Sequence, residues 1–223
     1  QQMNSFSRSF FLKASFCIAF TVFFSSCSDE NTLEAEINRI PVTIDIDRFD
    51  LKFYNANPEE YIELKKSYPY LFPNQFPDSI WVKRQRDSIQ TLLHAEIKKA
   101  YPSLDPVKEE LVSLYKHIKY YFPQIQDPHV VTVVNNVDYQ SKTIFTDSLL
   151  IISLDTYLGS KNPLYEGIPK YIVQDMEFPY MTSHIIDELG NALVKSPVNR
   201  TLLGQMIYYG KKLYLKDLML SQT

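Results

Sequence analysis

Cysteine is scarce in this 223-residue chain, and its two cysteines, Cys17 and Cys27, both lie near the N-terminus. So few cysteines exclude a disulfide framework and a zinc site built from several thiolates. Glycine is rare as well, with five residues, and neither a glycine-rich phosphate loop nor a nucleophile elbow is present. The net charge of −3 gives no electrostatic basis for binding nucleic acid.

The N-terminal apolar run, Ala14–Phe24, is too short to cross a bilayer and follows the basic residues Arg8 and Lys13. This order predicts a signal peptide over residues 1–26. Two serines then lead into Cys27, and a small-residue site ending in cysteine resembles the lipobox of bacterial lipoproteins, in the looser form of Bacteroidetes. The resemblance implies that the Cys27 thiol carries a diacylglyceryl group, that the peptide is cleaved before Cys27 and that the new amine is acylated as well, for example by palmitate. The alternative is an ordinary secretory signal followed by an unrelated cysteine.

Acyl chains on Cys27 would hold the protein at a membrane surface, because each buried CH₂ contributes about 0.8 kcal/mol. We expect residues 27–32 to form the lipidated cysteine and a polar tether, and residues 33–223 to form a single domain. A strongly periodic pattern runs to the end of the chain, so we expect this domain to be truncated at its C-terminus. The acidic residues after Cys27 resemble surface-export signals, which favours the outer membrane and surface exposure.

Hydrophobic residues make up 45% of the whole chain, which predicts one packed core in the domain. Apolar periodicity predicts an α+β fold, in which a helical hairpin packs with a small mixed β-sheet and two further helices follow at the C-terminus. The predicted helices span 57–68, 89–101, 105–122, 180–194 and 199–220, and the predicted strands lie at 42–46, 130–134, 143–145 and 149–154.

The last predicted helix carries a long apolar stripe, which we expect to face the core. Gly210 lies in the middle of this helix, where glycine costs about 1 kcal/mol relative to alanine. We therefore expect a close approach of the preceding helix at Gly210. The stripe consists of Leu203, Met206, Ile207, Leu213, Tyr214 and Leu218.

His184 and Glu188 are the one pair whose spacing suggests metal chemistry, since positions four apart share a helical face. A zinc-peptidase helix needs a second histidine at position 188 and a glutamate at 185, where this chain has Glu188 and Ile185. The sequence therefore favours a hydrogen-bonded surface pair over a metal site, and we expect no cofactor.

Three aspartates, Asp138, Asp147 and Asp155, lie on or beside the predicted strands. They could form a carboxylate cluster for acid–base chemistry. The favoured alternative is that each binds nearby backbone N–H groups at a turn or strand end.

Eight segments form an ordered set, at residues 40–50, 68–73 with 76–81, 117–123, 138–139, 147–151, 154–159, 165–172 and 205–211. Together they resemble the gliding motility lipoprotein GldB family of Bacteroidetes. The resemblance implies a lipid-anchored envelope protein that works with other gliding-machinery proteins, and it defines no catalytic residues.

The order of strands and helices is also distantly similar to zinc-peptidase-like domains, although the ligand set is missing and Tyr209 stands where a glutamate would precede Gly210. We therefore expect a non-enzymatic component of the gliding machinery that acts through protein contacts. The alternative is a divergent envelope hydrolase with a metal site at His184 and Glu188.

Overall fold

The computed structural model describes residues 29–146, 148–199 and 201–220, so Cys27 and the predicted signal peptide lie outside the described residues. The chain divides into two units, residues 1–41 and 42–223. In the first, helix α2 (Asp29–Asn38) includes part of the predicted polar tether. None of the described helices combines the length and apolarity that a membrane span requires.

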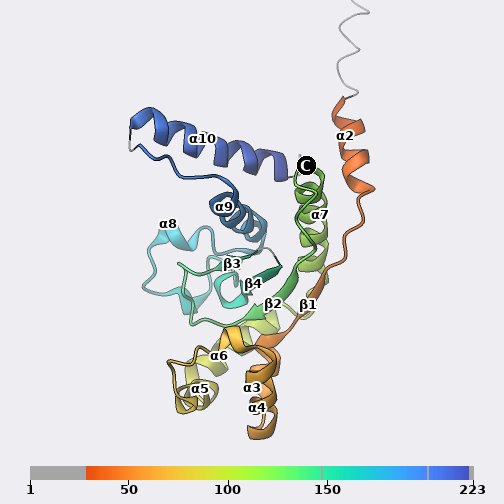
Figure 1. Ribbon diagram of the computed structural model, residues 1–223. Helices are drawn as coiled ribbons and strands as arrows, with labels where there is room; N and C mark the ends of the chain where they lie inside the picture. Colours follow the sequence, from red (N-terminus) through yellow and green to blue (C-terminus); the bar gives the residue numbers. More distant parts are fainter. Residues whose placement is uncertain (1–28, 147, 200, 221–223) are drawn as a thin grey trace, which may run out of the picture. The chain divides into compact units, whose positions relative to one another are not determined.

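The second unit is built on a mixed four-stranded sheet in the order β1-β2-β4-β3 (Figure 1). Strands β1 (Asp45–Asp47), β2 (His129–Val133) and β4 (Leu149–Ser153) are parallel, and β3 (Thr143–Phe145) pairs antiparallel with β4. The predicted α+β class and the mixed sheet are therefore confirmed. The β-branched runs of β2 and β4 fit central strands that are covered on both faces.

Helices α7 (Asp105–Tyr121) and α9 (Met181–Leu193) cover one face of the sheet. Leu111 and Ile118 of α7 and Ile185 of α9 share one core cluster with Val130 and Ile152 of the strands. Alternate residues of β2 face the opposite side, where Val131 packs in a second cluster. This alternation places two separate apolar clusters on the two faces of a single small sheet.

Helices α3 (Phe49–Asn55) and α4 (Pro58–Ser67) build the second cluster, which is mostly aromatic. The predicted start of α4 is confirmed, because the Asn57 side chain accepts from the Glu59 and Glu60 backbone N–H groups and Glu60 bonds back to Asn57 N–H. The remaining short elements are η1 (Pro69–Leu71), α5 (Asp78–Gln85), η2 (Leu154–Thr156), η3 (Pro163–Tyr165), α8 (Lys170–Val173) and η4 (Phe178–Tyr180).

The predicted helices at 89–101 and 105–122 are present as α6 (Ser88–Ala100) and α7, but the predicted hairpin is wrong. The main contacts of α6 are with η2, at the end of β4, whereas α7 packs on α9 and α10. Each helix finds a larger apolar partner elsewhere than in its sequence neighbour, because the sheet and α9 cover the inner stripe of α7.

Helix α10 (Leu202–Met219) packs on α9 and α7 through a narrow face that includes Leu215 and Met219. The expectation that its long apolar stripe faces the core is wrong. Leu203 is 67% exposed and Leu213 is 68% exposed, and of the predicted stripe Leu218 alone is half-buried. The periodicity correctly indicates that α10 has an apolar face. However, α10 has apolar residues on two sides, and the side with fewer of them faces the core.

The close helix approach predicted at Gly210 is also wrong. A Cβ atom added at Gly210 would meet nothing within 4 Å, whereas one added at Gly190 of α9 would lie 3.3 Å from Cε of Lys212 and 3.7 Å from Cδ2 of Leu215. The two C-terminal helices therefore do approach closely at a glycine, but the glycine belongs to α9.

Candidate functional site

His184 of α9 lies half-buried between Lys142, which directly precedes β3, and Tyr157, which follows η2. Its Nδ1 lies 3.0 Å from the Tyr157 hydroxyl and its Nε2 lies 3.4 Å from Nζ of Lys142. A lysine ammonium can only donate, so Nε2 is the acceptor and the proton is on Nδ1, which donates to Tyr157. Burial, with Lys142 adding to it, lowers the pKa of His184 to about 4, and the ring is neutral at pH 7.

Glu188 is not brought into contact with His184. Its carboxylate accepts a long hydrogen bond from Nδ2 of Asn191, at 3.5 Å, so the expected pair four residues apart is wrong. Among the described residues, no group of three histidine, cysteine, aspartate or glutamate side chains converges as a metal site would require. Tyr209 of α10 is 58% exposed.

Asp155 follows the predicted backbone-binding alternative. Its fully buried carboxylate accepts from the N–H of Asn135, at 3.1 and 3.2 Å, and from the N–H of Val137, at 2.7 Å. Burial raises the pKa of Asp155 to about 6, and these backbone bonds oppose that rise. Asp138 accepts from the N–H of Gln140 at 3.0 Å in a local turn, and Asp147 lies outside the described residues.

The loop that Asp155 holds is strained. Asn136 and Val137 have φ angles of 62° and 57°, and a β-branched residue rarely adopts this left-handed conformation. Besides Asp155, the loop is held by Arg84, whose Nη2 donates to the Val134 carbonyl at 2.9 Å, and by Gln90, which donates to Asn136 Oδ1. Backbone strain of this kind, about 1–3 kcal/mol per residue, persists where the surroundings over-determine the conformation, often beside functional sites.

A cavity of about 300 Å³ lies between this loop, the end of β2 and β4, and the aromatic cluster. Phe49, Phe53 and Phe72 form a buried wall, and Trp81 packs edge-on against two of these rings. The polar residues that line the cavity are Asp50, Arg84, Gln90, His94, Asn135, Asp138, Ser141 and Ser153. An apolar cavity with a few polar groups at the carboxyl end of parallel strands is a typical place for a small ligand.

Sequence reasoning missed this cavity, because its lining comes from segments up to a hundred residues apart. Arg84 and His94 follow no spacing motif, and each lies on a helix whose pattern indicates only its apolar side. The one local sequence signal near the cavity is the pair Asn135-Asn136, which is typical of a turn and forms the left-handed loop.

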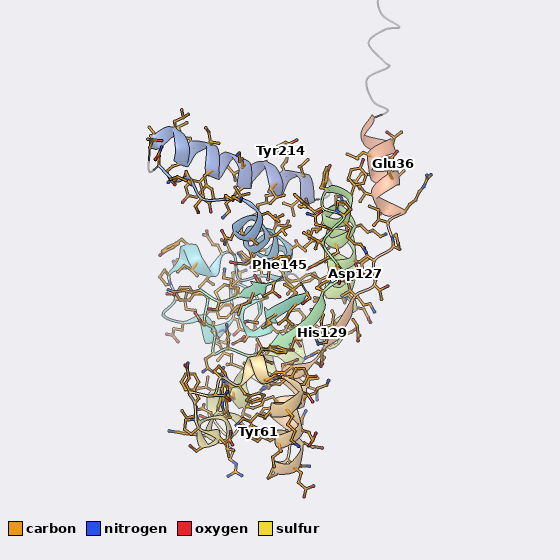
Figure 2. All side chains as sticks on the ribbon, viewed as in Figure 1. Glu36, Tyr61, Asp127, His129, Phe145 and Tyr214 are labelled. Atoms are coloured by element: carbon orange, nitrogen blue, oxygen red, sulfur yellow. The ribbon has the colours of Figure 1, made fainter. Side chains whose placement is uncertain are left out.

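A second candidate site is the outer face of α10, which we define as Leu202, Leu203, Met206, Ile207, Leu213 and Tyr214. Each of these side chains is at least half exposed. Tyr214, labelled in Figure 2, extends from the helix with 65% of its surface exposed. Two lysines of α10 point the other way, since Lys212 donates to Asn191 Oδ1 at 2.7 Å and Lys216 pairs with Asp187 at 2.8 Å.

Comparison with known proteins gives a match to a protein family. No solved structure and no curated protein shows significant similarity to the chain, so the distant similarity to zinc-peptidase-like domains gains no support. The sequence pattern of the gliding motility protein GldB family matches residues 30–223, which is nearly all of the chain that the structure describes. This chain therefore belongs to the gliding motility protein GldB family.

Proposed function

We propose that this protein is a lipid-anchored component of the gliding machinery in the cell envelope, and that it acts through protein contacts rather than catalysis. The family match supports the link to gliding. The basic, apolar and small-residue order before Cys27 supports the anchor. Acyl chains on Cys27 would keep the second unit beside the membrane, where its partners are concentrated.

The outer face of α10 is the observation that carries the contact role. An amphipathic surface helix normally turns its apolar residues inward and its polar residues to water. In α10 the lysines Lys212 and Lys216 bond to α9, while the apolar side chains of the outer face point away from it. Burying one leucine of this size contributes about 1.5–3 kcal/mol, so covering several of them would drive association.

The partner that this face fits is an apolar groove or helix on another protein of the gliding machinery. Gly210 lies on the exposed part of α10 with nothing within 4 Å of an added Cβ atom, so a partner could approach the helix backbone closely there.

Charge on the outer face of α10 tests this proposal. We expect the double substitution Leu203→Glu and Leu213→Glu to abolish cell spreading and the crosslinked complex of the anchored protein. The melting temperature should be unchanged, because both side chains are more than 60% exposed. Lys211→Glu, on the same helix and also exposed, is the matched control and should retain both properties. Normal spreading with an unchanged crosslinking pattern in the double variant would refute the contact role of this face.

A further inference from the structure

The cavity beside β2 and β4 contains polar groups that the fold itself does not use. His94 is 93% buried, stacks on Tyr54 at 4.0 Å between ring centroids, and makes no hydrogen bond among the described residues. The indole N–H of Trp81 is also buried without a partner. Buried polar atoms are nearly always hydrogen-bonded, and two exceptions on the wall of one cavity indicate a ligand site.

Arg84 is the strongest of these groups. Its one hydrogen bond, from Nη2 to the Val134 carbonyl, leaves its other N–H donors without a partner among the described residues. No aspartate or glutamate forms a direct ion pair with it there. Asp155 lies close enough to act on the charge of Arg84, but its carboxylate is hydrogen-bonded to the N–H groups of Asn135 and Val137 and not to the guanidinium. A half-buried guanidinium with free donors beside an apolar wall favours an anionic group on the ligand.

The other titratable residues that line the cavity are weaker candidates than Arg84 for binding a charged ligand. The Asp50 carboxylate already has hydrogen-bonding partners. Arg48 donates to both of its oxygens, at 2.9 and 2.7 Å, and the Thr132 hydroxyl donates to it at 2.6 Å. Burial lowers the pKa of His94 to about 4, so this ring is neutral at pH 7. Asp138 remains, and it lies exposed to solvent, where its charge is screened.

The apolar part of the cavity sets the size and shape of the ligand. Phe49, Phe53 and Phe72 are each less than 10% exposed and form the inner wall, while Tyr70 and Ile144, each nearly half exposed, border the opening. A volume of about 300 Å³ is at the lower end for ligand pockets, so a body of one or two rings fits. Aromatic walls bind such a body through edge-to-face and stacked contacts.

We infer that this cavity binds a small organic acid, whose carboxylate contacts Arg84 and whose apolar body contacts the aromatic wall. The strained loop at Asn136 and Val137 then has a role, because it holds the Val134 carbonyl that positions the guanidinium. This site is separate from the outer face of α10, so its test is independent of the proposed contact role.

Trp81, the single tryptophan of the chain, lies on the cavity wall and reports binding directly. The purified full chain is titrated with three matched probes, 3-phenylpropionate, 3-phenylpropionamide and 3-phenylpropylamine, while tryptophan fluorescence is recorded. We expect the acid to bind about tenfold more tightly than the neutral amide, the scale of one charge-assisted hydrogen bond, and the amine to bind weakest. Equal binding of acid and amide, tighter binding of the amine, or no binding of the acid would overturn the inference.

Three variants assign the charge preference to Arg84. Arg84→Gln should abolish the preference for the acid over the amide, whereas Arg84→Lys should retain it with weaker binding. Asp138→Asn removes the negative charge at the opening and should leave acid binding unchanged or tighter. A preserved acid preference in Arg84→Gln would contradict the assignment, as would a loss of acid binding in Asp138→Asn. The wild-type comparison of the three probes stands even where a variant fails to fold.

Discussion

At the scale of single residues, the buried titratable groups of this protein have opposite effects on stability in the same pH range. Burial lowers the pKa values of His94 and His184 to about 4, while it raises the pKa of Asp155 to about 6. As pH falls below 6.5, the unfolded histidines bind protons before the folded ones, so the folded state loses relative stability. The folded Asp155 binds its proton before the unfolded one, so it opposes this loss.

His94→Phe isolates one of these contributions. Phenylalanine keeps the stacking on Tyr54 and removes both the titration and the unpartnered ring nitrogen. A pKa lowered from 6.5 to about 4 corresponds to about 3 kcal/mol of stability that is present above pH 6.5 and lost towards pH 4. We therefore expect the unfolding free energy of the variant, from urea titrations, to fall less steeply than that of the wild type over this range. Parallel curves for the two proteins would contradict the prediction.

At the scale of elements, the contact between α9 and α10 depends on a single small residue. Gly190 faces Lys212 and Leu215, and the close approach brings Lys212 and Lys216 within hydrogen-bonding distance of α9. The polar bonds then fix the rotation of α10 about its axis. This rotation is what leaves its larger apolar face outside.

Gly190→Leu should separate the two helices. The added side chain would overlap Lys212 and Leu215, and overpacking of this kind costs about 1–3 kcal/mol. We expect a clearly lower melting temperature by calorimetry. Gly210→Leu is the matched control, because the same change on α10 meets nothing within 4 Å and should not lower the melting temperature. Equal melting temperatures in the two variants would contradict the prediction, because helix propensity favours leucine over glycine at both positions and only Gly190 contacts a neighbouring helix.

At the scale of the whole molecule, the proposed anchor and the proposed contact surface belong to different parts of the chain. Cys27 precedes the described residues, and the second unit begins at Val42. An anchor of this kind restricts the second unit to the membrane surface without fixing any contact within it. Surface exposure in the outer membrane is the proposed location, and proteinase K added to intact cells should then degrade the protein.

Cys27→Ser tests the anchor. Serine cannot form the thioether that transfer of a diacylglyceryl group to cysteine gives, so the variant should lose labelling by a clickable fatty acid and should keep its signal peptide. Fractionation should show the wild type in the membrane fraction, because several acyl chains give effectively permanent attachment. The same labelling of variant and wild type would rule out a lipid on Cys27.

Much of the local structure could be predicted because local rules decide it. The capping box at Asn57 and Glu60 and the β-branched run of β2 specify their elements within a few residues, and the structure confirms both. The buried positions Ile185, Ile186 and Leu189 of α9 also follow from spacing alone. The family resemblance depends on sequence as well, and the family match confirms it.

The pairing of elements and the cavity were decided by the tertiary structure alone. Sequence periodicity indicates that α6, α7 and α10 each have an apolar face, but it carries no information on which partner covers that face. Helix α10 shows the physical reason, since Gly190 of another helix selects the smaller of its two apolar faces. Arg84, His94 and Trp81 meet because a sheet and three helices bring distant segments together, and no local pattern could place their side chains around one cavity.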